Sequence, residues 1–500
     1  MNKKDRFLYI TTLSLLCSLF IWQFQSITVC ALPVISEPEQ RTSIPIETNQ
    51  IPDWPQGPVI TAQSAILIDA NSGAVLYAKN VHEKLYPAST TKLLTSLIAT
   101  EQCTMDEVVT FSHDAVFDAP RDSSHIAIDV GEELTMEQCL NAILIASANE
   151  VAFGVAEHIA GTWQDFAPIM NQRAKELGCV DSNFVNPNGL PDDNHYTSSY
   201  DLAMIGRAFF ANELLCKISS TKRLDIPASD KQPDHIVAES KNQLFASRPY
   251  VYEYLVGSKT GYTSAAKSSL VSCAEKDGLK LIAVVMVEDS PAQFADTVTL
   301  FNYGFSNFES INISQTETRF QIDNANFFYS DNDILGSSKP ILSLNTRDCI
   351  TLPKTINLEN TESKITYDTQ NPGQAALILY TYQNQFLGSV SVDFANNPEN
   401  EYAFEEGTMQ SDKEDSVVEE PNQPKVIFIN IFKVLLWILG VAAFLILVIW
   451  FRSFLVNYHF EGKDRSCRRS WLKSNRKRSR KFSYRERANY NKRRRGRHLR

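Results

Sequence analysis

Apolar positions in the first part of the chain change between strand spacing and helical spacing. Two short apolar runs flank Asn71-Ser72-Gly73, and strand-like runs around such a polar turn predict a β-hairpin. Further along, leucine and isoleucine recur every three or four residues, which predicts a helix that begins near Ser89. The apolar positions of this helix are Leu93, Leu94, Leu97 and Ile98. The pattern thus predicts a hairpin followed by a helix.

Similar patterns continue through the next part of the chain. Residues 135–161 form a long helical pattern that is broken near Ser147. Two apolar strands are predicted within 267–289, and a helix that ends at Gly304 follows them. Because strands lie at both ends with helices between them, we predict one mixed α/β domain over residues 61–308.

The segments around this domain differ from it in composition. Residues 32–60 hold six prolines, which predicts a linker or an extended arm. Residues 309–395 contain short strand-like runs separated by polar turns, which predicts a small β-rich domain. Residues 396–425 are acidic and hydrophilic, so we expect a flexible linker without a core of its own.

Two strongly apolar segments predict an exported chain that is anchored in a membrane. Residues 1–31 combine a basic start, an apolar run and a cleavage point after Ala31, which is typical of a secretory signal peptide; an uncleaved signal anchor is the alternative. Residues 426–451 are long and apolar enough for a transmembrane helix. The basic tail that follows, 452–500, is then cytoplasmic by the positive-inside rule. We predict a single-pass protein of the cell membrane whose main domain is extracytoplasmic.

Charge is divided unevenly between the body and the tail. The formal net charge is −10, but residues 452–500 contain 19 Lys and Arg against 3 Asp and Glu, a net of +16. The first 451 residues therefore carry a net charge of −26. We expect the tail to set the topology and to attract anionic lipid, and an acidic partner or a nucleic acid is the alternative.

Cysteine spacing favours neither a disulfide framework nor a metal site. Nine cysteines are spread singly along the chain, and six of them lie in the part predicted to be exported. The sequence has no Cys-x-x-Cys pair and no His-Glu-x-x-His motif. From the sequence alone we expect no metal.

Ser89 and Lys92 form a Ser-x-x-Lys pair at the start of the predicted helix. Residues three apart lie on one helix face, but a cation in the first turn opposes the helix dipole at a cost of up to about 1 kcal/mol. A serine hydroxyl becomes a good nucleophile when a neighbouring base takes its proton, and a lysine with a lowered pKa can be that base. Because Ser-x-x-Lys is also common by chance, an incidental surface lysine is the alternative.

Two further segments carry polar residues that suit a binding site. Ser147-Ala148-Asn149 interrupts an apolar helical run, where polar side chains are unusual unless they face a cleft; an ordinary loop with a helix cap is the alternative. Lys259-Thr260-Gly261 lies on a strand-like run. Its lysine and threonine can bind an anion, and its glycine lets the backbone approach a ligand closely. A turn with a solvated lysine is the alternative there.

The three motifs occur in one order, Ser-x-x-Lys, Ser-x-Asn and Lys-Thr-Gly. This order resembles the motif set of penicillin-binding proteins and class A β-lactamases. The segments YPASTTKLLT, FVNPNGLPDDNHYTSSYDLAMIG, GSKTGYTSAAK and TLFNYGFSNFE resemble the low-molecular-weight serine D-alanyl-D-alanine carboxypeptidases of peptidase family S11. The resemblance covers about residues 61–395. It implies a β-lactamase/transpeptidase-like α/β catalytic domain, a small all-β domain and a C-terminal membrane anchor.

The resemblance implies a role for each residue of the first two motifs. Ser89 would attack the carbonyl between the two D-alanines that end a peptidoglycan stem peptide, with Lys92 as the proton acceptor. Ser147 would relay a proton to the leaving amine. Asn149 would orient the substrate amide and Lys92. From the third motif, Lys259 would keep the local potential positive, which favours a neutral Lys92.

The resemblance also implies how the substrate is held. Thr260 would contact the substrate carboxylate, and Gly261 would let the strand approach it. The backbone N–H groups of Ser89 and of a residue near Tyr262 would form the oxyanion hole. Water would then release the acyl group without a metal or an organic cofactor, and β-lactam antibiotics would be covalent inhibitors.

Three positions depart from the family pattern. Ala148 stands where glycine is usual, Lys267 where glycine is common, and Gln293 where many relatives have an arginine that holds the terminal carboxylate. Substrate affinity would then depend on whether Lys267 compensates electrostatically for Gln293. His195 also matches a family position, and we expect it to brace a loop rather than to react.

Other functions fit parts of the pattern. A β-lactamase of class A needs a separate carboxylate for deacylation, and the sequence has no convincing equivalent loop. A D,D-endopeptidase that acts on cross-links is an alternative that the sequence leaves open. A protein that binds or senses cell-wall peptides without turnover is a third alternative, supported by Gln293 and by the long tail.

Overall fold

The computed structural model describes residues 32–245, 247–316, 342–367, 371 and 373–394. The predicted signal peptide, acidic linker, transmembrane helix and basic tail lie outside these residues. None of the helices in the described part of the chain has both the length and the apolar character needed to cross a bilayer. The membrane anchor therefore stays a prediction from the sequence.

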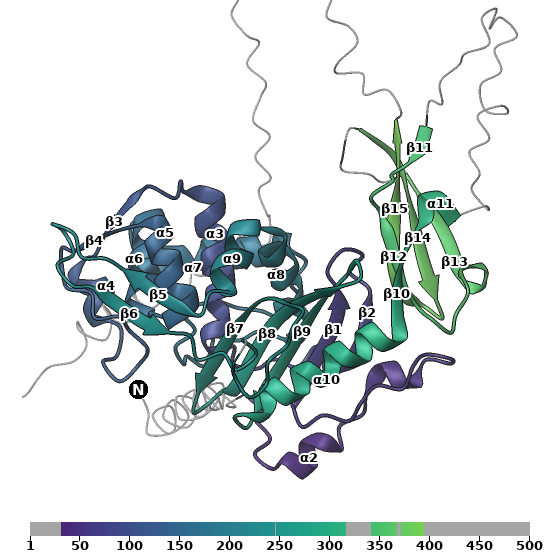
Figure 1. Cartoon of the computed structure of the whole chain (residues 1–500), viewed down its shortest axis with the longest axis horizontal. Coiled ribbons are helices and arrows are strands. Elements are labelled where there is room, and N and C mark those ends of the chain that lie inside the picture. The colour runs from purple at the N-terminus through teal and green to yellow at the C-terminus, as the bar shows by residue number, and fades with distance from the viewer. Residues whose placement is uncertain (1–31, 246, 317–341, 368–370, 372, 395–500) are drawn as a thin grey trace, which may run out of the picture. The chain divides into compact units, whose positions relative to one another are not determined.

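A five-stranded antiparallel sheet organises the first and larger part of the described chain, in the order β2-β1-β9-β8-β7 (Figure 1). The strands are β1 (Ser64–Asp69), β2 (Val75–Lys79), β7 (Leu255–Thr263), β8 (Lys267–Lys276) and β9 (Leu279–Glu288). β1 and β2 form the predicted hairpin, and β8 and β9 are the two predicted later strands. β1 also pairs with β9, so the start and the end of the domain meet in the middle of the sheet.

Helices cover both faces of the sheet. On one face α8 packs against β1, β8 and β9, with a layer of helices around α3 beyond it, and on the other face lies α10 (Figure 1). The helices are α3 (Lys92–Gln102), α5 (Met136–Asn141), α6 (Asn149–Ala160), α7 (Trp163–Glu176), α8 (Ser199–Ala211), α9 (Glu213–Ser219) and α10 (Ala292–Asn307). Smaller elements are β3 (Val108–Thr110), α4 (His113–Phe117), β4 (Glu133–Thr135), β5 (Arg223–Ile226) and β6 (Ile236–Glu239).

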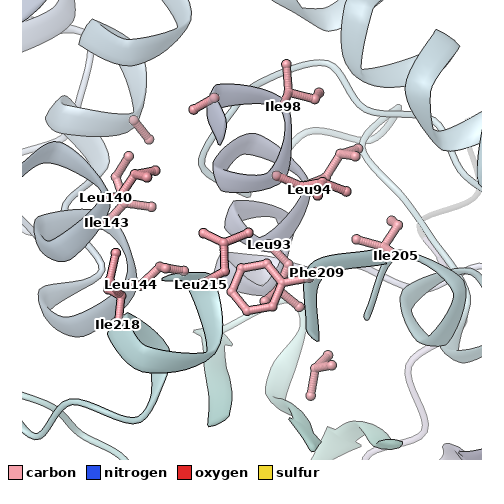
Figure 2. Close-up of a cluster of buried hydrophobic side chains, with 14 of the residues drawn as sticks. Leu93, Leu94, Ile98, Leu140, Ile143, Leu144, Ile205, Phe209, Leu215 and Ile218 are labelled. Carbon is pink, nitrogen blue, oxygen red and sulfur yellow. The ribbon is translucent and has the colours of Figure 1, made fainter. Parts of the chain in front are cut away.

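Alternate residues of the strands supply two hydrophobic cores, because successive side chains of a strand point to opposite faces. In β9, Ile282 and Val284 join the core that contains α3 and α8, whereas Leu281 and Val285 join the core under α10. Figure 2 shows the first core around α3. Its labelled residues are Leu93, Leu94, Ile98, Leu140, Ile143, Leu144, Ile205, Phe209, Leu215 and Ile218.

Gly304 lies inside α10 and does not end it. The predicted stop at this glycine is wrong, since the helix continues to Asn307. A Cβ at Gly304 would lie 2.5 Å from Leu281 Cδ1 and 2.8 Å from Leu67 Cδ2. The glycine therefore allows α10 to pack closely on the sheet. This packing offsets the cost of glycine in a helix interior, which is about 1 kcal/mol relative to alanine.

The proline-rich segment 32–60 differs from the linker that its composition predicts. It contains α2 (Pro38–Thr42) and a 3₁₀ turn, η1 (Glu47–Gln50). The Arg41 side chain is fully buried, and Trp54 is 3% exposed and donates an indole hydrogen bond to the Leu76 carbonyl of β2. Two large buried side chains thus hold this segment on the sheet domain, and proline spacing gives no sign of them.

The described residues after α10 form mainly strands, joined by turns and short loops. β10 (Phe308–Asn312) pairs with β12 (Cys349–Pro353). A single helical turn, α11 (Ile313–Thr316), follows β10. A second sheet has the strand order β11-β15-β14-β13. Its strands are β11 (Leu342–Leu344), β13 (Glu362–Thr366), β14 (Gln374–Tyr382) and β15 (Gln385–Phe394).

Candidate active site

Ser89 lies on a 3₁₀ turn, η2 (Ala88–Thr91), that leads directly into α3. The chain enters the turn through Ala88 in a left-handed conformation, with a φ of 49°. Gly189 packs so closely against the turn that a Cβ there would lie 1.8 Å from the Ala88 carbonyl oxygen. The helix predicted near Ser89 thus begins at Lys92, and Ser89 sits on a tightly packed turn in front of it.

The Lys92 amine lies under Ser89 and has three oxygen neighbours. Nζ is 3.1 Å from Ser89 Oγ, 2.6 Å from Asn149 Oδ1 and 2.7 Å from the Asn188 carbonyl oxygen. A neutral amine has two N–H donors and one lone pair. The amide and carbonyl oxygens accept the two donors, which leaves the lone pair for the hydroxyl of Ser89. The geometry allows a neutral amine that accepts a proton from Ser89, and it is the electrostatics of the site that favour this form over a charged amine with three donors.

Electrostatics around Lys92 favour the same protonation state. Its side chain is fully buried, and burial holds the pKa of the Lys92 amine well below its ordinary value. The positive charge of Lys259 lowers this pKa further, and the carboxyl of Glu150 opposes both effects. A lysine in such surroundings can act as a base near neutral pH.

Ser147 lies at the predicted break between helices. A π-helical turn, η3 (Ala142–Ala146), ends in Ser147, whose φ of 61° and ψ of 32° are left-handed, and α6 starts at Asn149. The Ser147 hydroxyl accepts a hydrogen bond of 3.0 Å from Lys259 Nζ. Strained residues next to π-helical turns concentrate at functional sites, and here the strain turns a hydroxyl out of the apolar helix layer.

Lys259 on β7 brings the third motif to the same place. Its side chain is 2% exposed, and Nζ donates to Ser147 Oγ and, at 2.8 Å, to the Thr260 carbonyl. Burial, followed by the charge of Lys241, lowers the pKa of Lys259 to about 7. The site therefore holds two buried lysines with lowered pKa values, and the charge of Lys259 contributes to the lowering at Lys92.

β7 is an edge strand and runs beside the Ser89 turn. Gly261 makes this approach possible, because a Cβ there would lie 3.0 Å from the Pro87 carbonyl oxygen and 3.2 Å from the Ser89 nitrogen. The Tyr262 side chain next to it is 68% exposed. An edge strand has unpaired backbone groups that can hold an extended peptide, so β7 can contribute main-chain contacts.

These residues surround a cleft of about 1200 Å³. The predicted site residues that line it are Ser89, Ser147, Asn149, Thr260, Gly261 and Tyr262. Lys92 and Lys259 are buried beneath its surface, where each amine reaches a lining hydroxyl. The structure thus brings all eight predicted residues together, six in the wall of the cleft and two below it.

Gln293 also lines this cleft, and Lys267, which could have compensated for it, is paired elsewhere. Gln293 is 6% exposed, and its Oε1 has no hydrogen-bond partner among the described residues. Lys267 Nζ instead forms a 2.8 Å ion pair with Asp289 and donates to the Ser36 carbonyl at 3.1 Å. The positive charge of Lys267 is therefore already paired, and Gln293 faces the cleft with a neutral amide.

His195 has the bracing contacts expected of a structural residue. It is 1% exposed, its Nε2 lies 2.9 Å from Thr91 Oγ1, and its Nδ1 accepts a hydrogen bond from the Val185 backbone N–H. Burial lowers the pKa of His195 to about 3, so the imidazole is neutral. It ties the loop before α8 to the turn that carries Ser89.

Two contributors to the site were missed from the sequence. The first is the Asn188 carbonyl, which binds Lys92. Every residue has a backbone carbonyl, so the residue type does not reveal this contact, although Asn188-Gly189 is a common turn dipeptide. Glu150 is 2% exposed and accepts a hydrogen bond from the Ile126 N–H at 2.6 Å. Its position directly after Asn149 was the available signal.

Solved structures with this architecture belong to the penicillin-binding proteins. Penicillin-binding protein 5 from Haemophilus influenzae is 26% identical, with a TM-score of 0.53, and the match covers 69% of this chain and 99% of that one. Penicillin-binding protein 6B from Escherichia coli is 25% identical, with a TM-score of 0.51, over 68% of this chain and 98% of that one. The fold is therefore the α/β transpeptidase-like fold of the penicillin-binding-protein class.

Sequence comparison defines the family within this class. Residues 51–290 match peptidase family S11, D-alanyl-D-alanine carboxypeptidase. The carboxypeptidase DacF of Bacillus subtilis (strain 168) is 35% identical over 255 residues, which are 50% of this chain and 63% of that protein. DacA of Haemophilus influenzae is 32% identical over 283 residues, which are 55% of this chain and 69% of that protein. The chain belongs to the S11 family of D-alanyl-D-alanine carboxypeptidases, which are serine hydrolases.

Proposed function

We propose that this chain removes the terminal D-alanine from peptidoglycan stem peptides through an acyl-enzyme on Ser89. The observation that carries the proposal is the buried Lys92 amine, 3.1 Å from Ser89 Oγ and with a strongly lowered pKa. Such a pair supplies a nucleophile and its base in one turn of chain. The family matches support the same reaction, because the relatives are named for it.

The acylation step follows from this geometry. Ser89 Oγ attacks the carbonyl carbon of the penultimate D-alanine while its proton moves to Lys92 Nζ. The oxyanion that forms is stabilised by backbone N–H groups at Ser89 and near Tyr262. The carbon–nitrogen bond then breaks, and the Ser147 hydroxyl passes the proton from Lys92 to the leaving amine. One D-alanine leaves, and the shortened peptide stays on Ser89 as an ester.

Hydrolysis of the ester completes the cycle. Water adds to the ester carbonyl, and Lys92 takes its proton. The bond to Ser89 Oγ breaks, and the serine regains a proton from Lys92. The sum is one water consumed, one D-alanine released and one peptide shortened by a residue, with the enzyme returned to its starting state.

Substrate binding follows from the residues above the two amines. Asn149 and Thr260 line the cleft, so they can bind the peptide amide and the terminal carboxylate. The charge of Lys259 below them favours an anionic substrate end. β-Lactams carry an acyl group and a carboxylate in the same relation, so we propose them as covalent inhibitors that acylate Ser89.

The test uses the purified full-length chain with a peptide that ends in D-Ala-D-Ala and with a fluorescent penicillin. We expect D-alanine release and one covalent label on the peptide that contains Ser89. Ser89→Ala should abolish both. Ser123→Ala, a change of another serine that lines the cleft, should preserve both. A folded wild-type chain that is not labelled, or a labelled Ser89→Ala variant, contradicts the proposal.

We propose further that the enzyme is a single-pass membrane protein with its catalytic domain outside the cell and its basic tail in the cytoplasm. The support is the order of the apolar and charged segments in the sequence. Protease added to intact cells should remove the catalytic domain and spare an epitope on the tail. An epitope that is cleaved in intact cells contradicts this topology.

A further inference from the structure

Cys103, Glu107 and His158 come together at a site that the proposed reaction does not use. One ligand atom from each of them lies within 4.8 Å of the others. Cys103 follows the last residue of α3, Glu107 lies in the next turn, and His158 lies in the last turn of α6. The three side chains therefore join two helices and one loop at one point.

We propose that Cys103, Glu107 and His158 bind a zinc ion that fastens the C-terminal ends of α3 and α6 to each other. The donors are one sulfur, one oxygen and one nitrogen, a set that suits Zn²⁺ better than Ca²⁺ or Mg²⁺, which prefer oxygen alone. Zinc is commonly four-coordinate, and a water completes the set here because the side chains of His158 and Glu107 are 26% and 39% exposed.

The ligand spacing is close to that of a tetrahedral site. With metal–ligand distances of about 2.0–2.3 Å, neighbouring ligand atoms stand roughly 3.4–3.6 Å apart. His158 Nε2 and Glu107 Oε2 are 3.0 Å apart, and the group as a whole lies within 4.8 Å. Rotation of side chains, without movement of the helices, therefore suffices to admit the ion.

Glu107 is held in position as a ligand should be. Its Oε1 accepts a hydrogen bond of 2.6 Å from the Thr104 backbone N–H, which leaves Oε2 directed at His158. The Glu107 carbonyl accepts a second backbone bond, of 2.8 Å, from the Met136 N–H. Support of this kind around a ligand orients it and raises metal affinity. Cys103 is a free thiol that is hydrogen-bonded to Glu107, and a zinc ion would replace the thiol proton of this contact.

The site has a defined relation to the catalytic groups. α3 begins with Lys92 and α6 begins with Asn149, and these two side chains are hydrogen-bonded to each other at 2.6 Å. The two helices are thus joined at their N-terminal ends by the catalytic contact. A bound ion would join them at the opposite ends. Motif spacing does not reveal this site, because His158 lies 51 positions after Glu107.

The alternative is an ion pair between Glu107 and His158 in which Cys103 is only a hydrogen-bond partner of Glu107. The two arrangements differ in one respect, because only the zinc site needs the sulfur. Replacement of Cys103 is therefore the deciding change, and His158→Gln is a second variant that keeps the test valid if the first variant fails to fold.

The test measures zinc content and cobalt spectra of the full-length chain, purified with a reducing agent. Wild-type protein dialysed against excess zinc should retain one more ion than Cys103→Ser or His158→Gln, as measured by plasma mass spectrometry. Cobalt should give a thiolate charge-transfer band that Cys103→Ser lacks. The controls are Cys216→Ser and His113→Gln, changes of another partly buried thiol and another exposed imidazole, which should retain the ion and the band.

Thermal unfolding gives a readout that does not depend on the reaction. Added zinc should raise the unfolding midpoint of the wild type by several degrees and leave that of Cys103→Ser unchanged, because only a native-state ligand stabilises the fold. Equal zinc content in wild type and Cys103→Ser, or a cobalt band that survives this substitution, overturns the proposal and leaves the ion pair.

Discussion

The buried cations Arg41 and Lys92 lie in the same domain but have opposite kinds of partners. Arg41 Nη2 is 3.4 Å from Glu288 and also pairs with Asp289, so its charge is compensated. The Lys92 amine has only neutral oxygens within hydrogen-bond distance, and the charge with the largest effect on its pKa is that of Lys259.

The difference explains how one fold uses a buried cation in two ways. A buried charge that faces carboxylates stays charged and holds segments together, as Arg41 holds the proline-rich segment to the end of β9. A buried amine that faces neutral acceptors and a like charge loses its proton and becomes a base. Partners, rather than depth, decide the role.

The largest effect is expected when Lys92 is made to resemble Arg41. Lys92→Arg keeps a cation but cannot accept a proton, because the guanidinium stays charged. We expect the rate of penicillin acylation to fall about 10²–10⁴-fold, the usual range of general acid–base catalysis. Stopped-flow labelling measures it, with circular dichroism to verify the fold. Acylation at the wild-type rate would show that Lys92 is not the base.

The second prediction concerns removal of Arg41, the buried cation whose charge is compensated by carboxylates. Arg41→Met removes the cation that pairs with the buried Glu288. Glu288 keeps its hydrogen bonds from Thr61 and the Asp289 N–H. Breaking a buried pair in this way costs up to about 3–5 kcal/mol of the free energy of unfolding. Urea denaturation measures this, while the acylation rate of the folded fraction should stay near the wild-type value. Arg248→Met breaks the more exposed pair with Glu239 and should cost at most about 1 kcal/mol. Equal losses in both variants would refute the distinction.

A third prediction concerns pH and Lys259. Lys259→Met removes the charge that lowers the pKa of Lys92, so the acid limb of the acylation rate against pH should move to higher pH. A limb that does not move, or that moves to lower pH, would refute this coupling.

The same variant has a stability signature. The pKa of Lys259 is about 7 in the folded chain against 10.5 unfolded, so between these values the unfolded state binds more protons and wild-type stability rises with pH. The variant lacks this contribution. Its advantage in the free energy of unfolding should be largest below pH 7 and should shrink toward about pH 10. A difference in the free energy of unfolding between variant and wild type that does not change with pH would contradict the lowered pKa of Lys259.

The smallest effect is expected at Glu150. Its carboxyl raises the pKa of Lys92, and burial raises its own pKa. Glu150→Gln keeps the acceptor for the Ile126 N–H and removes the negative charge. The acid limb of acylation should then move to lower pH, in the opposite direction to the Lys259 variant and by less, because the charge of Lys259 has the larger effect on Lys92. Shifts in the same direction would mean that charge is not the cause.

The sequence predicts the parts of the site that depend on local spacing. Ser89 and Lys92 are one helical turn apart, so their proximity follows from the chain itself. The contact between Ser147 and Lys259 joins residues 112 positions apart, and only the likeness to a known motif order indicated it. The strand hairpins were likewise predictable, because alternation and turn residues are local signals.

The remaining features depend on packing that local patterns do not encode. Gly304 has the propensity of a helix stop, but contact with Leu281 keeps it inside α10. Prolines indicate a linker at 32–60, whereas the buried Arg41 and Trp54 dock it on the sheet domain. Lys267 has the charge to replace a missing arginine near Gln293, yet Asp289 already neutralises it. In each case a long-range partner decides the outcome.

The pairing of β1 with β9 has a consequence for how the chain folds. The sheet cannot close until residue 288 is available, because the central partner of the first strand is the last strand of the domain. Contacts so distant along the chain give a high contact order and slow folding. Until β9 is available, the hairpin of β1 and β2 has an unpaired edge on β1, and such an edge is prone to aggregation. Maturation of this enzyme should therefore depend on assistance that shields its first hairpin.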